Sequence, residues 1–157
     1  MKINEIEEFT RDWDWFAVDP EGRIAHFTTA GQRALPRSVK QDQEAALKLI
    51  DYFFQETPRG APYTVRAEAE GGAGRWADDQ ARSLYLKDFV AMASAGLFSY
   101  NADISGATKN YFQVAFPKEP LYIDQLPSFI YGLVGRTRSP FLFSESAYIF
   151  EIDTHNW

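Results

Sequence analysis

Histidine is the usual general base in enzymes, and this sequence of 157 residues holds only two of them. His26 lies inside residues 12–31, a stretch that also contains two tryptophans and several carboxylates. His155 lies near the C-terminal end, where fraying is the usual expectation. Because no partner motif accompanies His26, we expect it to be a packed or half-exposed strand residue. The candidate binding residues of this stretch are Asp12, Trp13, Asp14, Trp15, Asp19, Glu21 and His26.

No recognisable catalytic or metal-binding signature occurs in the sequence. Without cysteine there is no thiolate nucleophile, disulfide or Cys-ligated zinc. No serine stands in a G-x-S-x-G elbow, and the histidine spacings of zinc enzymes are missing. The glycine-rich segment 70–75 lacks the Gly-Lys-Ser/Thr ending of a phosphate loop, so it is predicted to be a flexible connector. We therefore predict no catalytic residue, no metal and no cofactor, and the sequence leans toward a non-enzyme.

Negative charge is concentrated at the N-terminal end. The net charge is -6, and residues 1–21 contain seven acids against two bases. A nucleic-acid-binding protein needs a positive cluster instead, because phosphate contacts supply much of its affinity. The charge favours a basic protein partner, although a solvated acidic segment that only aids solubility is the simpler alternative. Aromatic residues make up 16% of the chain, and some of them could anchor a partner; Trp13 and Trp157 lie near the two ends, where burial is least assured.

Hydrophobic periodicity predicts an α+β fold in one domain spanning residues 1–157. Asp19, Pro20 and Gly22 favour a tight turn between two strands, and Ser38 is a plausible N-cap for a long helix. We expect a mixed or mainly antiparallel sheet of five to six strands, with two long helices on one face and a short third helix. The expected strands are 15–19, 23–28, 63–66, 97–101, 111–116, 141–143 and a central 147–152, and the expected helices are 38–56, 78–95 and 126–134.

The same patterns bear on where the protein resides. The first residues are acidic rather than basic and then apolar, which argues against a signal peptide. The longest uncharged run, residues 89–102, is too short and too polar to span a bilayer. The lack of cysteine fits a reducing compartment. These features predict a soluble, cytoplasmic protein with no membrane or nucleic-acid partner; its oligomeric state stays open.

Residues 14–31 follow the pattern Asp-Trp-Phe-Ala-Val-Asp-x-x-Gly-x-Ile-Ala-x-Phe-x-x-Ala-Gly. Together with the strand at 111–117 and the helix near Leu126, this pattern resembles small bacterial immunity proteins found beside polymorphic toxins. The resemblance implies an acidic, cytoplasmic, non-enzymatic protein that binds and blocks a toxin domain.

Two alternative functions remain beside the hypothesis of an immunity protein. One is a small enzyme or ligand-binding domain in which Asp14, Asp19 and His26 line a cleft for a carbohydrate or another small polar ligand. Paired carboxylates such as Asp12 and Asp14, with tryptophans as stacking platforms, would suit a sugar. The other alternative is an oligomeric structural protein with its aromatic residues in the interface.

Overall fold

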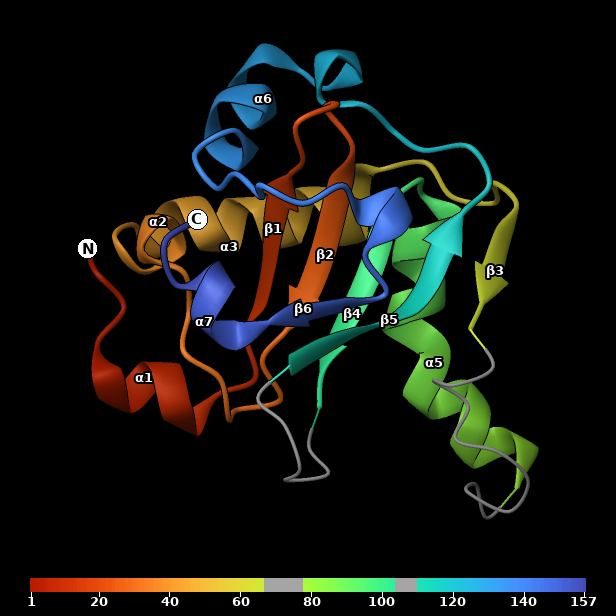
Figure 1. The fold of residues 1–157 in the computed structure, drawn as a ribbon, viewed down its shortest axis with the longest axis horizontal. Coiled ribbons are helices and arrows are strands. Elements are labelled where there is room, and N and C mark those ends of the chain that lie inside the picture. Colours follow the sequence, from red (N-terminus) through yellow and green to blue (C-terminus); the bar gives the residue numbers. More distant parts are fainter. Residues whose placement is uncertain (67–77, 104–109) are drawn as a thin grey trace.

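The computed structural model describes residues 1–66, 78–103 and 110–157, and within them the chain is α+β with a mixed six-stranded sheet (Figure 1). The strands run in the order β1-β2-β4-β5-β3, and β6 pairs with β5 as well. The predicted fold class is confirmed at this level. The strands are β1 (Asp14–Val18), β2 (Ile24–Thr28), β3 (Tyr63–Val65), β4 (Phe98–Ala102), β5 (Asn110–Pro117) and β6 (Tyr148–Phe150).

The N-terminal hairpin forms as its turn chemistry predicts. Strands β1 and β2 pair antiparallel, with Phe16 opposite His26. The buried carboxylate of Asp19 accepts the backbone N–H groups of Glu21 at 3.0 Å and Arg23 at 2.9 Å, which closes the turn. Gly22 has a φ of 84°, a conformation that favours glycine.

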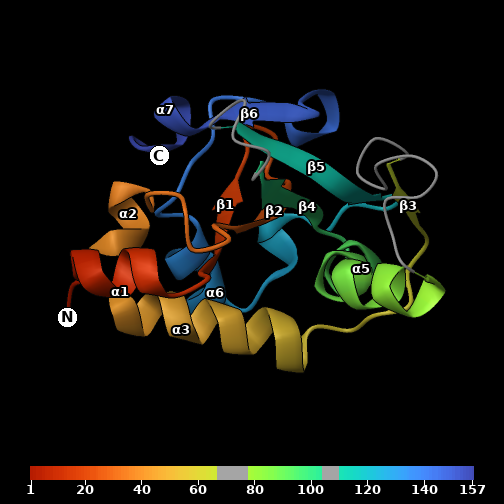
Figure 2. The same ribbon diagram turned by 90° about the horizontal axis from the view of Figure 1, so that it is seen from below.

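Helices cover one face of the sheet, as Figure 2 shows from below, while β6 and the C-terminal segment lie across the other. Helix α3 continues as a π-helical turn over Tyr52–Glu56. Helix α5 ends at Ser94, and Gly96, which follows the C-cap Ala95, has a φ of 99° that fits the predicted glycine after the helix. The helices are α1 (Glu5–Thr10), α2 (Arg37–Lys40), α3 (Gln43–Asp51), α5 (Asp79–Ser94), α6 (Ser128–Val134) and α7 (Glu151–Thr154).

The predicted helix from Ser38 to Glu56 is interrupted near its start. Asp42 has extended backbone angles, and its side chain accepts the N–H of Ala45, so it caps α3 as a new helix. Ser38 lies inside α2 and is not the N-cap; its hydroxyl donates to the carbonyl of Trp157 at 2.7 Å. A capping aspartate inside a periodic apolar pattern therefore divides one predicted helix into two.

Two expectations for the C-terminal third are wrong. Residues 141–143 form no strand, because Phe143 begins a short 3₁₀ turn instead. The expected central strand at 147–152 is the short β6, which pairs only with β5 and lies at the sheet edge. Tyr148 and Phe150 are consequently exposed, and only Ile149 between them enters the core. Hydrophobicity alone did not separate an edge strand from a central one.

Strands β2 and β4 pair in parallel, which makes the sheet mixed. The chain between them includes α2, α3, β3 and α5, so these three helices come from the crossover, whereas α6 joins the helix-covered face from the C-terminal third. The glycine-rich segment 70–75 lies in the same crossover but outside the described residues. Among the helices that the structure describes, none is both long and apolar enough to cross a membrane.

Candidate functional site

Three strands bring Asp14, His26 and Ser99 together on the helix-covered face of the sheet. In the strand register, His26 on β2 lies opposite Phe16 on β1 and Ser99 on β4. Asp14 is two residues before Phe16 on β1, so its side chain is on the same face of the sheet. The Nε2 atom of His26 lies 2.6 Å from Asp14 Oδ1, and its Nδ1 atom lies 2.7 Å from Ser99 Oγ. Strand alternation therefore produces a continuous hydrogen-bonded chain across β1, β2 and β4.

Only one end of this chain reaches solvent. His26 and Ser99 are fully buried, whereas the side chain of Asp14 retains 27% of its exposure. The imidazole ring of His26 also contacts the aromatic rings of Phe54 and Phe89, with centroid separations of 5.6 and 6.2 Å. The histidine is thus a buried polar residue with both ring nitrogens hydrogen-bonded, and Asp14 is its link to the surface.

The Asp14–His26–Ser99 chain has the residue types of a serine hydrolase triad but not its geometry. In such a triad the nucleophilic serine bonds Nε2, the carboxylate bonds Nδ1, and the serine hydroxyl faces the substrate. Here the two nitrogens have exchanged partners, and the hydroxyl of Ser99 is enclosed in the core. A buried hydroxyl cannot attack an external carbonyl, so this arrangement does not support nucleophilic hydrolysis.

A second polar chain runs beside the first. The hydroxyl of Thr28 donates to Asn101 Oδ1 at 2.8 Å, and the amide nitrogen of Asn101 donates to the hydroxyl of Tyr85 at 3.0 Å. This chain links β2 and β4 to α5. Together the two chains give the helix-covered face a polar strip whose buried groups are hydrogen-bonded, which is what a stable interior requires.

The carboxylate of Asp12 lies at the exposed end of the strip, where the charges of two other carboxylates, Asp14 and Asp88, act on it. Asp12 accepts the N–H of Ala30 at 2.8 Å. Burial raises the pKa of Asp12 most, and the charges of Asp14 and Asp88 raise it further, while the Ala30 hydrogen bond and His26 lower it. Within the described parts of the chain, no lysine or arginine forms an ion pair with these three carboxylates. We call Asp12, Asp14 and Asp88 the acidic cluster.

The acidic cluster does not assemble a metal site. In the described ranges 1–66, 78–103 and 110–157, no group of three or more histidines and carboxylates has the placement to hold a metal ion. Asp14 Oδ1 is already used by His26, and Asp12 is used in part by a backbone N–H. The geometry therefore leaves the cluster as a site of negative charge at the surface.

The structure separates the remaining candidate residues from this cluster. Trp13 and Trp15 each keep 1% of their exposure, so neither is a surface anchor, and Trp157 is buried as well. Trp13 donates its indole N–H to the carbonyl of Glu7 at 2.9 Å. Trp13 and Trp157, whose burial was least assured from their places near the chain ends, are thus both buried in one core.

The acids of the hairpin turn have structural roles. Asp19 also accepts the N–H of Phe143 at 3.1 Å, on the face of the sheet opposite to His26, so Asp14, Asp19 and His26 do not line one cleft. Glu21 pairs with Arg23 at 2.5 Å. In α1, the buried Glu8 pairs with Lys40 at 2.5 Å. Much of the negative charge in residues 1–21 is thus neutralised or hydrogen-bonded within the fold.

Sequence reasoning missed Ser99 and Asp88. Both are distant from residues 12–31 in the chain and come into place only through the parallel pairing of β2 with β4 and the packing of α5. One sequence signal could have indicated Ser99: a serine within a predicted strand of largely apolar character needs a hydrogen-bond partner when it is buried. The chain matches no protein-family model, no curated protein and no solved structure.

Proposed function

We propose that this chain is a non-enzymatic protein-binding module of the immunity type, which holds a basic surface of a toxin domain against the acidic cluster. The observation that carries the proposal is that Asp12 is under the charge of Asp14 and Asp88, and that none of the three forms an ion pair with a lysine or arginine among the described residues. Carboxylates that repel one another gain most from an external cation. A lysine or arginine of a partner would relieve that repulsion on binding.

Exposed apolar side chains next to the cluster in the chain support the same surface. Ile6 and Phe9 on α1 keep 75% and 50% of their exposure, and α1 leads directly into Asp12. Apolar and aromatic contacts supply much of the energy in protein interfaces, whereas charges mainly set the partner and the rate of association. Exposed apolar side chains thus occur close in sequence to the uncompensated carboxylate of Asp12.

The carbohydrate or small-ligand alternative has less support. Both ring nitrogens of His26 are engaged, so the histidine offers no free donor or acceptor to a ligand. The tryptophans that would stack on a sugar are buried. A polar ligand would find only the exposed part of Asp14 and its neighbouring carboxylates, which again favours a cationic group.

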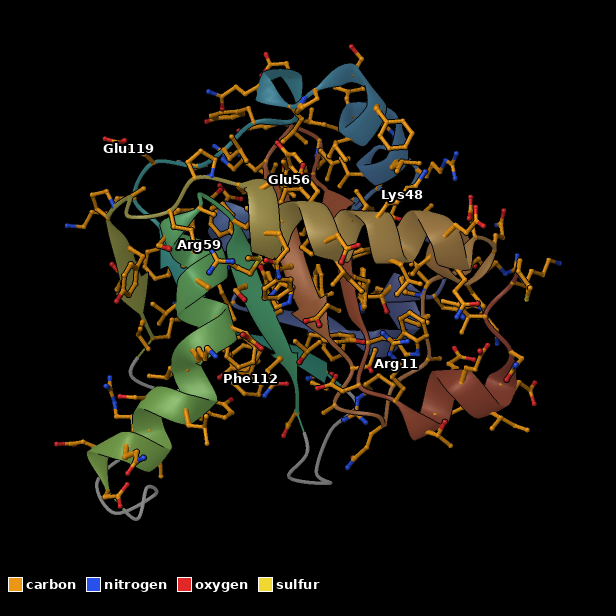
Figure 3. All side chains as sticks on the ribbon, turned by 180° about the vertical axis from the view of Figure 1, so that it is seen from behind. Arg11, Lys48, Glu56, Arg59, Phe112 and Glu119 are labelled. Carbon is orange, nitrogen blue, oxygen red and sulfur yellow. The ribbon has the colours of Figure 1, made fainter. Side chains whose placement is uncertain are left out.

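The first step of the experiment is to search beside the gene in the native host for a toxin-like reading frame. A frame found there is then co-expressed with this chain, and binding is measured on the purified pair. The wild-type chain is expected to protect growth and to bind the toxin domain. Asp12→Asn combined with Asp88→Asn is expected to slow association about tenfold at low ionic strength, because both charges act at the contact surface. Glu119→Gln is the matched control, since Glu119 is exposed and lies far from Arg11 and the start of β1 (Figure 3).

Two results would overturn this proposal. One is the lack of both a neighbouring toxin-like frame and a specific protein partner for the tagged chain in its host. The other is a bound partner whose affinity does not respond to Asp12→Asn and Asp88→Asn. Equal losses from the double variant and Glu119→Gln would indicate a general effect of net charge and would also exclude the acidic cluster as the contact site.

A further inference from the structure

A basic hollow lies where the N-terminal segment meets α2. Its volume is about 490 Å³, which falls in the range of roughly 300–1,000 Å³ that is common for small-molecule sites. Three of its five lining residues are cations, although the whole chain has a net charge of -6. The lining residues are Lys2, Ile3, Arg37, Lys40 and Gln41.

The backbone of this hollow is held on two sides. The N–H of Ile3 donates to the carbonyl of Lys40 at 2.9 Å, and the N–H of Arg37 donates to the carbonyl of His155 at 3.1 Å. The side chain of Ile3 is buried, with 1% exposure, and fixes the N-terminal segment to the core. The cations of the hollow therefore extend from anchored backbone. Less backbone freedom has to be lost when a ligand binds, which lowers the entropic cost of binding.

The positive charges of the hollow are only partly compensated. Lys40 forms an ion pair with the buried carboxylate of Glu8. The exposed side chains of Lys2 and Arg37 form no ion pair with any residue that the structure describes. Two positive charges thus remain available. An anion that entered the hollow would meet Lys2 and Arg37 without having to displace an internal carboxylate.

We propose that this hollow binds a phosphate group, either as free phosphate or as the monoester of a small molecule. The planar guanidinium of Arg37 suits two phosphate oxygens at once, and Lys2 supplies a mobile point charge. A phosphate monoester carries about -1.5 to -2 charges at neutral pH, which matches the two uncompensated cations. The volume exceeds what a phosphate group fills, so the hollow has room for an organic portion. This site is independent of the acidic cluster and of the proposed toxin binding.

The test is a titration of the isotopically labelled chain at low ionic strength, followed through its backbone amide resonances. The probes are inorganic phosphate and glucose 6-phosphate, with glucose as the uncharged control. Saturable shifts centred on Ile3, Arg37 and Gln41 are expected, with a dissociation constant of about 1 mM. Inorganic phosphate and glucose 6-phosphate of equal affinity would identify a free-phosphate site, whereas tighter binding of the ester would identify a small-molecule site.

Variants locate the binding. Arg37→Gln is expected to weaken phosphate binding about tenfold, and Lys2→Gln about threefold, because the arginine makes two charge-assisted hydrogen bonds. Lys48→Gln is the matched control: Lys48 is an exposed cation on α3, near the ring of Phe129 (Figure 3). All three substitutions are at exposed side chains, and unchanged thermal unfolding confirms that each variant folds.

The proposal fails if neither phosphate nor glucose 6-phosphate gives saturable shifts at tens of millimolar. It also fails if Lys48→Gln weakens binding as much as Arg37→Gln does, since the effect would then reflect overall charge. Loss of phosphate binding in Arg37→Gln with toxin binding retained would separate this site from the acidic cluster. If the Asp12→Asn and Asp88→Asn variant lost toxin binding but still bound phosphate, the phosphate site would be supported as a separate site.

Discussion

The two faces of strands β1, β2 and β4 are built by different physical means. On one face the rings of Trp15, Phe27 and Tyr100 stack, with centroids 4.1 and 4.7 Å apart and nearly parallel planes. On the other face, at neighbouring positions of the same strands, His26 and Ser99 belong to the polar strip. The first face is stabilised by apolar area and ring contacts. The second combines apolar side chains such as Phe16 and Ile24 with hydrogen bonds that have directions.

This contrast separates stability from specificity. Aromatic contacts tolerate small shifts of one strand against the next, whereas the hydrogen bonds from His26 to Asp14 and Ser99 form only in the observed register. A shift of either pairing by one residue would move His26 to the aromatic face and leave its nitrogens unpaired. We infer that the aromatic face contributes more free energy of folding and that the polar strip selects the strand register.

The largest effect is expected at the centre of the aromatic face. Phe27→Ala should lower the free energy of unfolding by about 3–5 kcal/mol, because Phe27 is fully buried and contacts several other rings. Urea unfolding followed by far-ultraviolet circular dichroism measures this loss. Tyr148→Ala is the control, since Tyr148 keeps 59% of its exposure and should change stability by less than about 0.5 kcal/mol. If both variants lost the same free energy of unfolding, the special contribution of the aromatic face would be contradicted.

A smaller effect is expected in the polar strip. His26→Leu fills much of the same space but leaves the hydroxyl of Ser99 and one oxygen of Asp14 without their partner, at a cost of about 2 kcal/mol. Adding Ser99→Ala removes the unpaired buried hydroxyl, so the double variant should be more stable than the sum of the two single losses by about 1 kcal/mol. A double-mutant cycle in urea measures this coupling. Strict additivity would show that His26 and Ser99 act independently.

The smallest effect is expected at the exposed end of the strip. Burial and the neighbouring carboxylates raise the pKa of Asp12, so its ionised form weakens the folded state. That penalty is complete above the raised folded-state pKa and disappears as the pH falls below the ordinary value of 3.8. Asp12→Asn keeps an oxygen that can accept the N–H of Ala30. The variant should therefore melt about 1–2 °C higher at neutral pH.

The pH profile of that difference is the decisive readout. Thermal unfolding of wild-type and Asp12→Asn proteins should converge in acid, where Asp12 is protonated in both the folded and the unfolded states. Glu119→Gln again serves as the control, because Glu119 is an exposed acid that lies far from Arg11, the neighbour of Asp12 in the chain (Figure 3). A difference that persists unchanged into acid would contradict the explanation by charge.

Local sequence signals predicted most of the elements, and their failures have physical causes. The Asp19-to-Gly22 turn and the cap at Gly96 depend on residues close in the chain, so the sequence identified them correctly. Whether β6 is a central or an edge strand depends on which strands pair with it. No local sequence pattern encodes these partners. The break between α2 and α3 depends on Asp42, which caps α3 although the apolar period continues across it.

The candidate site was less predictable than the fold. His26 and Asp14 were both candidate residues. The hydrogen bond between them runs diagonally from β2 to β1, so it depends on the register of the hairpin, which the sequence did not determine. Ser99 and Asp88 come from the other side of the crossover. Acid counts also overstated the acidic surface, because Glu8 and Asp19 are used inside the fold. Charge counts do not distinguish a carboxylate that binds the chain's own backbone from one that faces a partner.

The parallel pairing of β2 with β4 also has a consequence for how the chain folds. Residues 29–97 separate these adjacent strands, and closing so long a loop before its contacts form slows folding. During synthesis the β1–β2 hairpin emerges before α3, α5 and β4, so Trp15, Phe16 and Phe27 still lack these elements as cover. The nascent chain therefore exposes these aromatic side chains until the crossover and β4 have been made. We expect refolding on the millisecond-to-second scale and aggregation that begins from this hairpin.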